Sequence, residues 1–132
     1  MSSASTPSLY DRLGEPTIRA AVSAFYVRAF EDVFIGYFFY GKRHEELAAQ
    51  QIDFTIALLG GPRRYAGRPV APLHAGIGIR PPHFARRQRL LEDVLGEMGV
   101  EPALAAEWIA LEESLRPLIL GGGTPPPGPR RP

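Results

Sequence analysis

The chain has 132 residues, with 15 basic and 14 acidic side chains, a formal net charge of +1 and no cysteine. This length suits a single domain with a hydrophobic core, and the near balance of charge excludes a strong field that would attract nucleic acid or a membrane surface. Without cysteine, the chain has no disulfide framework, thiolate zinc site or cysteine nucleophile.

Both ends of the chain are predicted to lie outside the fold. Residues 1–7 are rich in Ser, Thr and Pro, and residues 121–132 read GGGTPPPGPRRP. Such segments bury too little apolar surface to offset their chain entropy, so we predict disorder at 1–7 and 121–132 and one domain over 8–120. The polar N-terminus lacks the apolar stretch of a signal peptide, and no apolar run approaches the roughly 20 residues that span a bilayer. We therefore expect a cytoplasmic domain with neither a membrane nor nucleic acid as partner.

The first long helix is predicted to begin near Pro16, because proline suits the first turn of a helix, and to end near Glu31. Apolar side chains recur along one helical face at positions 18, 22, 25, 29 and 30. The next segment, FIGYFFYG at 34–41, holds five aromatic residues among eight. It is too short and too closely flanked by glycine for a long helix, so we expect one or two tight turns buried against the core.

The second long helix is predicted within RHEELAAQQIDFTIALLGG, residues 43–61. Leu47, Phe54 and Leu58 share one face of this helix. Gly60 and Gly61, followed by proline, stop it as a glycine C-cap does. Residues 62–69, PRRYAGRP, are expected to form a loop, and residues 70–76 to hold a short helical piece at most.

Two further helices complete the predicted all-α fold. One opens at Pro81 and Pro82 and closes at Gly99, and the other begins near Pro102. Their expected inward residues are Phe84, Leu91, Val94, Leu95 and Met98 in the former and Leu104, Trp108, Leu111, Leu115 and Leu118 in the latter. No segment shows convincing period-2 alternation with β-branched residues, the pattern that would indicate strands.

Two polar residues interrupt the apolar faces of the predicted helices. Gln51 lies on the face formed by positions 47, 54 and 58, and Tyr26 flanks Phe25. A buried glutamine or tyrosine needs hydrogen-bond partners or loses roughly 1–3 kcal/mol. Either these side chains bond to the backbone or to each other inside the core, or they point into a cavity that holds a polar ligand.

One histidine lies in the stretch PLHAGIGI, residues 72–79. His74 precedes Gly76 and Gly78, which permit sharp turning of the backbone, and the predicted core is rich in aromatic and leucine side chains. A flat apolar cofactor with one metal bond suits such a surface, and heme iron accepts a neutral imidazole. Zinc suits it less, because zinc needs three or four ligands and His44 and His83 are distant in the sequence. A structural or exposed histidine is the alternative.

Over roughly residues 8–119 the chain resembles the truncated hemoglobins, most closely the group I type. The shared patterns are LYDRLG at 9–14, FYVRAF at 25–30, YFF at 37–39, LAAQQIDF at 47–54, LGGPRRYAG at 59–67 and HAGIGIRPPHF at 74–84. Each pattern is weak alone, but six in this order are specific. The resemblance implies a truncated globin-like two-over-two helical sandwich around a pocket that binds heme b.

The resemblance also implies roles for individual residues. His74 takes the position of the ligand to the heme iron. On the opposite, distal side of the heme, Tyr26 donates a hydrogen bond to bound oxygen, Gln51 supports it, and Phe25 lies beside them. The remaining contacts to the cofactor are expected from Phe39, Leu47, Arg64, Tyr65, Ile79, Phe84 and Arg87.

Arg87 departs from the family pattern, in which an apolar residue usually lies against the heme. One interpretation, which the sequence favours, turns Arg87 toward solvent with its aliphatic stem on the heme edge. The other sends its guanidinium into the pocket or onto a heme propionate. His83 follows two prolines near the start of a helix, so we expect it to pack or to cap that helix rather than to bind metal.

The expected function is tight binding of dioxygen by heme, with other diatomic gases as further ligands. Tight binding suits reaction with nitric oxide or oxygen scavenging better than transport. Nitric oxide dioxygenation would need a separate reductase as partner, because no flavin or nicotinamide fingerprint is present. Three alternatives stay open: a peroxidase-like enzyme that uses Arg87, a gas or heme sensor that signals through its tails, and a helical domain that has lost its heme.

Overall fold

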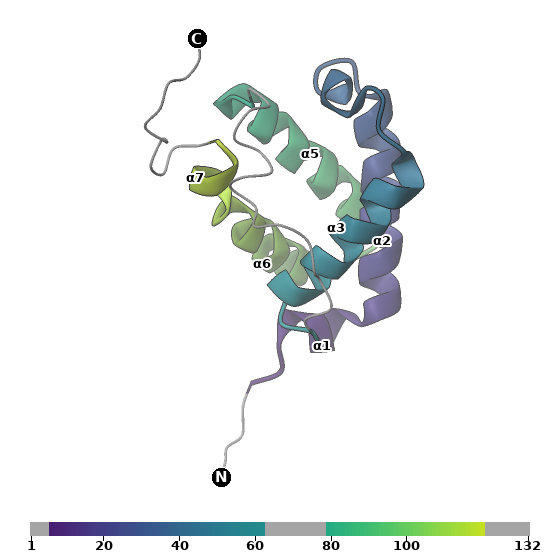
Figure 1. The fold of residues 1–132 in the computed structure, drawn as a ribbon. Coiled ribbons are helices and arrows are strands. Elements are labelled where there is room, and N and C mark those ends of the chain that lie inside the picture. The colour runs from purple at the N-terminus through teal and green to yellow at the C-terminus, as the bar shows by residue number, and fades with distance from the viewer. Residues whose placement is uncertain (1–5, 63–78, 121–132) are drawn as a thin grey trace.

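The structure is a computed structural model that describes residues 6–62 and 79–120. Every element in these two ranges is helical, which confirms the all-α prediction (Figure 1). In chain order the elements are α1 (Leu9–Leu13), α2 (Glu15–Glu31), the 3₁₀ helix η1 (Gly36–Phe39), α3 (His44–Leu58), α5 (Pro81–Glu97), α6 (Pro102–Glu113) and α7 (Arg116–Ile119). None of these helices is both long enough and apolar enough to cross a membrane.

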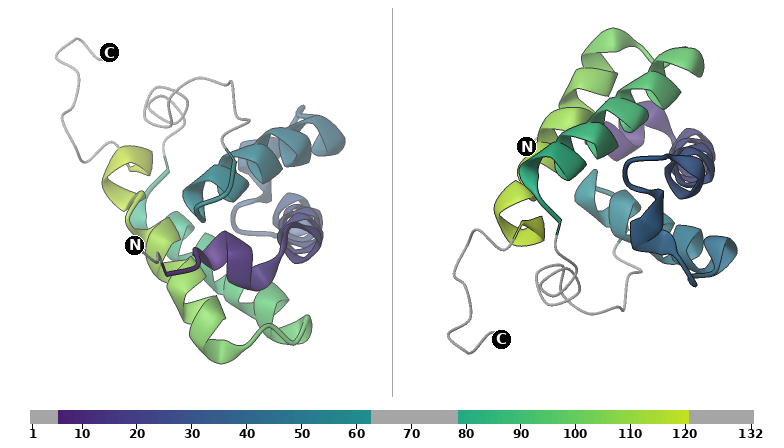
Figure 2. Two further views of the ribbon diagram at one scale, coloured as in Figure 1. Left: turned by 90° about the horizontal axis from the view of Figure 1, so that it is seen from below. Right: turned by 90° about the horizontal axis from the view of Figure 1, so that it is seen from above.

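The helices form two pairs around one core. α2 packs against both α3 and α5, and α5 packs against α6. Figures 1 and 2 show α3 crossing α2 on one side of the molecule and α5 lying beside α6 on the other. α1 contacts α2 and α6 at one end. The side chains of Ile18, Ile56, Leu95 and Trp108, contributed by α2, α3, α5 and α6, are 0 % exposed, so the core lies where the two pairs meet.

A short helix that the sequence did not predict, α1, closes the N-terminal end of the fold. The Ser8 hydroxyl accepts the N–H of Asp11 at 3.0 Å, and the Asp11 carboxylate accepts the N–H of Ser8 at 3.2 Å. This capping box satisfies two N–H groups at the start of the helix. The N–H of Tyr10 then donates to the carbonyl of Leu59 at 2.8 Å, which ties α1 to the end of α3.

The predicted stop at Gly60 and Gly61 is confirmed, because α3 ends at Leu58. Gly60 adopts a φ of +101°, a left-handed conformation that favours glycine. A Cβ on Gly61 would lie 2.6 Å from a ring carbon of Tyr10. The two glycines therefore both end α3 and permit the close approach of α1.

The sequence predicted that the aromatic segment 34–41 is buried, but the segment is only partly buried. Tyr37 is 61 % exposed and Tyr40 is 92 % exposed, whereas Ile35 is 3 % exposed and Phe38 and Phe39 pack against the core. The Asp32 carboxylate accepts the N–H groups of Phe34 and Ile35 at 2.9 and 3.0 Å. This turn reverses the chain directly after α2, so only part of the segment faces the core and the rest faces solvent.

The last predicted helix is broken into α6 and α7. Pro117 has no N–H to donate to the carbonyl four residues before it, so the α-helical ladder cannot continue through this position. α6 ends at Glu113 and α7 begins at Arg116. The break changes the buried face: Leu118, expected inward, is 43 % exposed, and Ile119 is buried instead. Met98, also expected inward, follows the end of α5 and is exposed.

Candidate functional site

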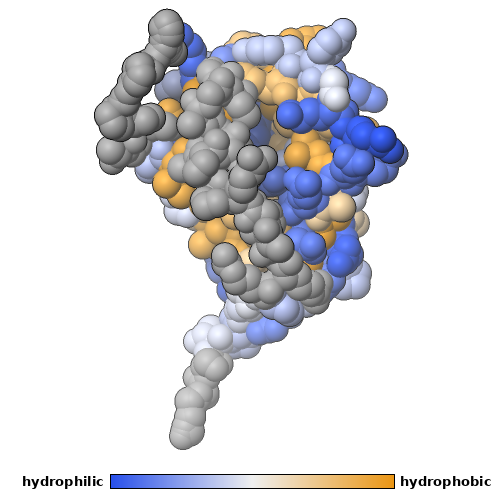
Figure 3. Space-filling model, in the orientation of Figure 1, coloured by the Kyte–Doolittle hydropathy of each residue, from blue (hydrophilic) through white to orange (hydrophobic). Residues whose placement is uncertain are grey.

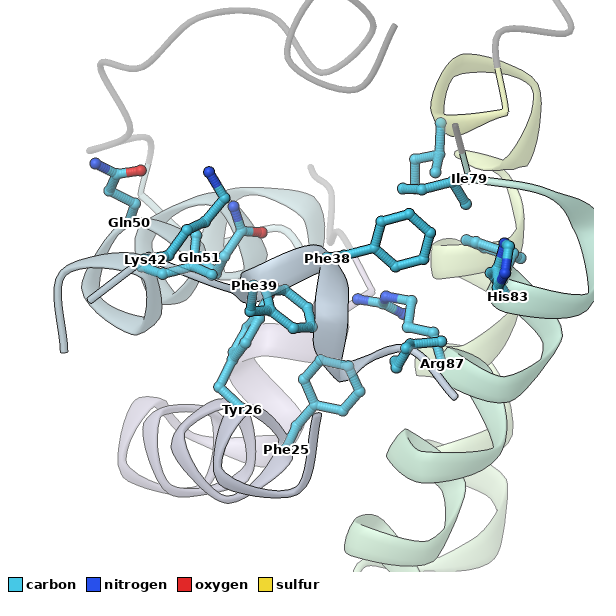
Figure 4. A pocket seen from close by; sticks show the side chains of 14 residues that line it. Phe25, Tyr26, Phe38, Phe39, Lys42, Gln50, Gln51, Ile79, His83 and Arg87 are labelled. Carbon is cyan, nitrogen blue, oxygen red and sulfur yellow. The ribbon is translucent and has the colours of Figure 1, made fainter. Parts of the chain in front are cut away.

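A pocket of about 290 Å³ opens between α2, η1, α3 and α5. This volume lies near the lower end of the range of roughly 300–1,000 Å³ typical of ligand pockets. Figure 3 shows apolar surface in orange within a hollow beside hydrophilic residues in blue, and Figure 4 shows the side chains from close by. The lining residues are Phe25, Tyr26, Ile35, Phe38, Phe39, Lys42, Leu47, Gln50, Gln51, Ile79, His83, Phe84, Arg87 and Ile119.

All the described residues that the sequence assigned to a heme site meet in this pocket. They are Phe25, Tyr26, Phe39, Leu47, Gln51, Ile79, Phe84 and Arg87. Arg64, Tyr65 and His74 lie outside the described residues. The structure therefore brings the predicted distal residues and the apolar contacts together, and their roles toward heme stay predictions.

α3 presents one face to the core and another to the pocket. Ala48, Ile52 and Ile56 are buried against the core. Leu47 and Gln51, four residues apart and so on one helical face, line the pocket instead. This division explains why a polar glutamine occupies an apolar helix.

Tyr26 reaches the pocket from α2, where two aromatic rings hold it edge-on. Its ring centroid lies 4.8 Å from that of Phe25 and 5.9 Å from that of Phe39. Tyr26 is only 7 % exposed, and this burial raises the pKa of its phenol to about 12. The phenol is therefore protonated at neutral pH and acts as a hydrogen-bond donor.

Tyr26 and Gln51 both line the cavity, which is the arrangement that the second interpretation of these residues expects. Within the two described ranges, neither the Tyr26 hydroxyl nor the Gln51 amide is engaged in a hydrogen bond with the protein. No described residue takes up the hydrogen-bonding capacity of these two groups, so a molecule in the cavity can use it. A ligand with a polar end would satisfy them at little cost, because they are already in place.

Arg87 lies in the pocket wall, so the favoured interpretation that it turns toward solvent is wrong. Its side chain is 23 % exposed and forms an ion pair of 3.0 Å with Glu112, which is 4 % exposed. Its Nη1 donates to the Gln88 side chain at 2.6 Å, and its guanidinium lies 5.0 Å from the centroid of the Phe25 ring. A buried carboxylate on α6 thus draws Arg87 inward, and a carboxylate 25 residues away cannot be read from the local sequence pattern.

A second layer of polar contacts supports this wall from behind. The Gln88 amide donates to the carbonyl of Ile109 at 3.3 Å and to the Glu113 carboxylate at 3.2 Å. Arg116 binds the same carboxylate and lowers the pKa of Glu113. The Arg116 guanidinium also covers the Phe84 ring at 4.8 Å. These contacts fix α5 against α6 and α7 on the far side of the pocket.

His83 caps α5 and also lines the pocket. Its Nδ1 accepts the N–H of Arg80 at 3.0 Å, and its ring packs against Phe38 with centroids 4.9 Å apart. The expected capping and packing role is therefore confirmed. The other described histidine, His44, packs on Phe30 at 5.2 Å and is not among the pocket residues.

The sequence missed several residues that line the pocket. Three of them, Phe38, Gln50 and His83, lie inside the quoted patterns at 37–39, 47–54 and 74–84, and His83 was assigned only a structural role. The other three are Ile35, Lys42 and Ile119, which no pattern indicated. The places of these three depend on the turn after α2 and on the break before α7, and neither could be read from helical periodicity.

The residues present fit a heme. Phe25, Phe38 and Phe39 supply flat apolar surface for a planar macrocycle, and Tyr26 supplies a protonated donor. Lys42 is exposed where it lines the pocket, a position that suits the carboxylates of a propionate-bearing group. Aromatic walls and a cationic edge suit a planar group that carries carboxylates, and the phenol of Tyr26 suits a polar ligand beside that group.

Comparisons with known proteins agree with this geometry. The family model for bacterial-like globins matches residues 8–119. The chain is 35 % identical over 116 residues to a group 1 truncated hemoglobin of Mycolicibacterium paratuberculosis, covering 87 % of this chain and 85 % of the relative. It is 33 % identical to a group 1 truncated hemoglobin of Tetrahymena thermophila, covering 87 % and 96 % of the two chains.

Solved structures of similar proteins share the fold. The truncated hemoglobin of Tetrahymena pyriformis in its Fe(III) form superposes with a TM-score of 0.82 at 32 % identity, covering 86 % of this chain and 97 % of that one. The 2/2 hemoglobin of Synechococcus sp. PCC 7002 superposes with a TM-score of 0.79 at 26 % identity, covering 86 % and 98 %.

Proposed function

Because this chain belongs to the bacterial-like globin family, as a group 1 truncated hemoglobin, we propose that its pocket holds dioxygen tightly through Tyr26 and Gln51. Heme b is its cofactor, and dioxygen and other diatomic gases are its ligands. When bound, the heme would supply the iron atom to which such a gas binds. The residues of this chain decide how strongly the gas is held.

His74 is the proposed iron ligand. It precedes Gly76 and Gly78 in the sequence and lies outside the described residues. The described apolar residues Phe39, Leu47, Ile79 and Phe84 are proposed to contact the faces and edges of the heme. Arg64 and Tyr65, also outside the described residues, are proposed to anchor it.

One observation supports tight oxygen binding above all: a buried, protonated phenol and an amide share an otherwise largely apolar pocket. Tyr26 donates from a site that is 7 % exposed, where water competes poorly for the hydrogen bond. A hydrogen bond to a partly charged ligand contributes on the order of 1.5–3 kcal/mol. Two such groups, Tyr26 and Gln51, favour slow release of oxygen, which suits scavenging or reaction with nitric oxide better than delivery.

Nitric oxide dioxygenation is the proposed reaction of this tightly held oxygen. Nitric oxide, dioxygen and one electron together give nitrate, so each turnover consumes one electron. The sequence carries no flavin or nicotinamide fingerprint, and we therefore propose a separate reductase as the electron donor. We also propose a cytoplasmic location, which is consistent with a chain free of cysteine and is tested by cell fractionation.

The direct test of tight binding is the rate constant for oxygen release from a Tyr26→Phe variant. Removing the hydroxyl keeps the aromatic packing and should speed release by about 10- to 100-fold, because one charge-assisted hydrogen bond is lost. Stopped-flow displacement of oxygen by carbon monoxide measures this rate constant.

The matched control is Tyr40→Phe, which makes the same chemical change at a side chain that is 92 % exposed and is not among the pocket residues. Oxygen release from this variant should match that of the unmodified protein. Equal release rates from all three proteins would contradict the role of Tyr26.

A further inference from the structure

Arg87 places a positive charge at the wall of a pocket that is otherwise mostly apolar. Figure 4 shows its guanidinium pointing into the space between Phe25, Phe38 and Phe39, away from the axis of α5. The stacking on Phe25 at 5.0 Å and the contact of 6.0 Å with the Phe84 ring hold the group at this place. A ligand that fills the cavity therefore lies next to a cation.

The hydrogen bonds of Arg87 leave part of its donor set for the cavity. A guanidinium carries five N–H donors. Among the described residues, Nη2 pairs with Glu112 at 3.0 Å and Nη1 donates to Gln88 at 2.6 Å. These two contacts use only part of the five N–H donors of the guanidinium, and the side chain lines the pocket. The described partners therefore leave N–H groups of Arg87 that a ligand can use.

Glu112 holds Arg87 in place and reduces its effective charge. Its second carboxylate oxygen accepts the indole N–H of Trp108 at 3.1 Å, so both oxygens are engaged and the carboxylate cannot easily move. Glu112→Gln removes the negative charge but keeps an oxygen that can accept from Arg87, so the field of Arg87 in the cavity should become stronger.

The charges of Arg87 and Glu112 also affect the pKa of the Tyr26 phenol. Burial is the largest cause of the raised pKa of Tyr26, and Arg87 acts against it while Glu112 adds to it. Arg87 and Tyr26 line the same pocket, so a molecule in that pocket lies near both side chains.

We propose that Arg87, positioned by Glu112, makes this pocket select small anionic ligands over neutral ones. The ligand class comprises monoanions that bind a ferric heme, such as fluoride, azide, nitrite or deprotonated peroxide. The inference rests on the proposed heme-loaded pocket and adds a specificity-determining residue to it. It follows from the geometry of this chain, because an apolar residue at this position would supply no charge.

A heme propionate is the competing partner for Arg87. Lys42 is the more favourable partner for this carboxylate, because Lys42 is exposed at the pocket. A charged propionate that pairs with it there keeps its contact with water. Arg87 is already paired with a carboxylate that is 4 % exposed, and a second large carboxylate there would need further desolvation. A small anion in the cavity needs less desolvation than a propionate carboxylate.

The test compares an anionic probe with a neutral one on the ferric, heme-loaded protein. Dissociation constants for fluoride and for imidazole are measured by absorption titration. In Arg87→Leu, the affinity for fluoride should fall by about tenfold or more, since a charge-assisted hydrogen bond is lost, while the affinity for imidazole should change by about twofold or less. In Glu112→Gln, the affinity for fluoride should rise.

Arg89→Leu is the matched control. This variant also removes one arginine charge from α5, but the side chain of Arg89 is 68 % exposed and pairs with Asp93. Both affinities should stay at the values of the unmodified protein. An equal loss of fluoride affinity in this control would show a general charge effect and would overturn the inference.

Removing Arg87 alone leaves a buried carboxylate without its partner, which can prevent folding. The double variant Arg87→Leu with Glu112→Leu replaces the pair by apolar side chains, a change that buried ion pairs often tolerate. It should bind heme and imidazole normally and lose the preference for fluoride.

Two results would overturn the inference and leave the proposed function intact. One is an unchanged ratio of the two affinities in the double variant, with Tyr26→Phe still releasing oxygen faster. The other is faster transfer of heme from the double variant to an acceptor protein, with an unchanged ratio of the fluoride and imidazole affinities. This result would assign Arg87 to a heme propionate. Failure of every variant and of the unmodified protein to bind heme would overturn both proposals together.

Discussion

Tyr26 owes its raised pKa mainly to burial, and this has a consequence for the stability of the fold. The pKa of about 12 in the folded chain lies above the value of about 10 expected for an unfolded phenol. Between these values the unfolded chain loses this proton and the folded chain keeps it. The stabilising effect is therefore fully present below about pH 10 and is lost as the pH rises through about 12.

The prediction is a pH-dependent difference between the unmodified protein and Tyr26→Phe. Across this interval the unmodified protein should lose about 2–3 kcal/mol more of its free energy of unfolding than the variant, because one pKa unit corresponds to about 1.4 kcal/mol. Urea unfolding at a series of pH values measures the difference. A difference that is constant from about pH 9 to pH 12 would show that the phenol titrates normally in the folded state.

Arg87 shows what a sequence pattern cannot decide at the level of one residue. Its place on α5 was predictable from the helix alone, but its direction depends on Glu112 and Gln88. A long side chain reaches either solvent or the interior, and the partner that decides lies on another helix. Tyr26 and Gln51 were easier to place, because each interrupts an apolar helical face that had to point inward.

At the scale of the elements, Asp32 joins α2 to α5. One oxygen accepts the N–H groups of Phe34 and Ile35, and the other accepts two N–H groups of Arg86 at 2.9 and 2.6 Å. The side chain of Asp32 is 4 % exposed, whereas that of Arg86 is 41 % exposed. The bond from Arg86 is the main reason that the pKa of Asp32 is lowered.

Asp32→Ala should therefore lower the free energy of unfolding by about 2–4 kcal/mol, because the loss of the carboxylate leaves two N–H groups and a guanidinium without their acceptor. Arg86→Leu should cost less, since the arginine is partly exposed. Urea unfolding at neutral pH checks the ranking. The opposite ranking would mean that the turn does not depend on its carboxylate.

The pH dependence of this effect has a fixed sign. A lowered pKa in the folded state means that the stabilising effect is present above the unfolded value of about 3.9 and is lost as the pH falls through the lower, folded value. The difference between the unmodified protein and Asp32→Ala should therefore shrink on acidification below about pH 4.

The elements that the sequence predicted well are those with sustained periodicity. α2, α3 and α5 each run for 15 residues or more, so several turns of apolar spacing and a proline or glycine mark their ends. α1 and α7 have five and four residues and show too little periodicity to detect. The exposure of residues 33–40 depends on the Asp32 turn, which is made by side-chain contacts that no pattern of hydropathy reveals.

At the scale of the whole molecule, the arrangement of the helices creates the pocket. α2 packs against both α3 and α5, and the pocket is lined by residues of all three helices. Much of the apolar surface that α3 and α5 turn toward each other therefore needs a flat occupant rather than a facing helix. The fold and the gathering of the described candidate residues in one pocket followed from the sequence. The distal roles of Tyr26 and Gln51 and the contacts of His74, Arg64 and Tyr65 with heme stay predictions.

The central claim is that one imidazole holds the heme while Tyr26 and Gln51 face its open side. The most direct test is the absorption spectrum of the heme-loaded protein and of His74→Gly, each with and without added imidazole. We predict a Soret band in the unmodified protein that is shifted or lost in the variant, and that free imidazole restores by entering the vacated space. A His74→Gly protein with an unchanged Soret band and unchanged heme retention would contradict this account.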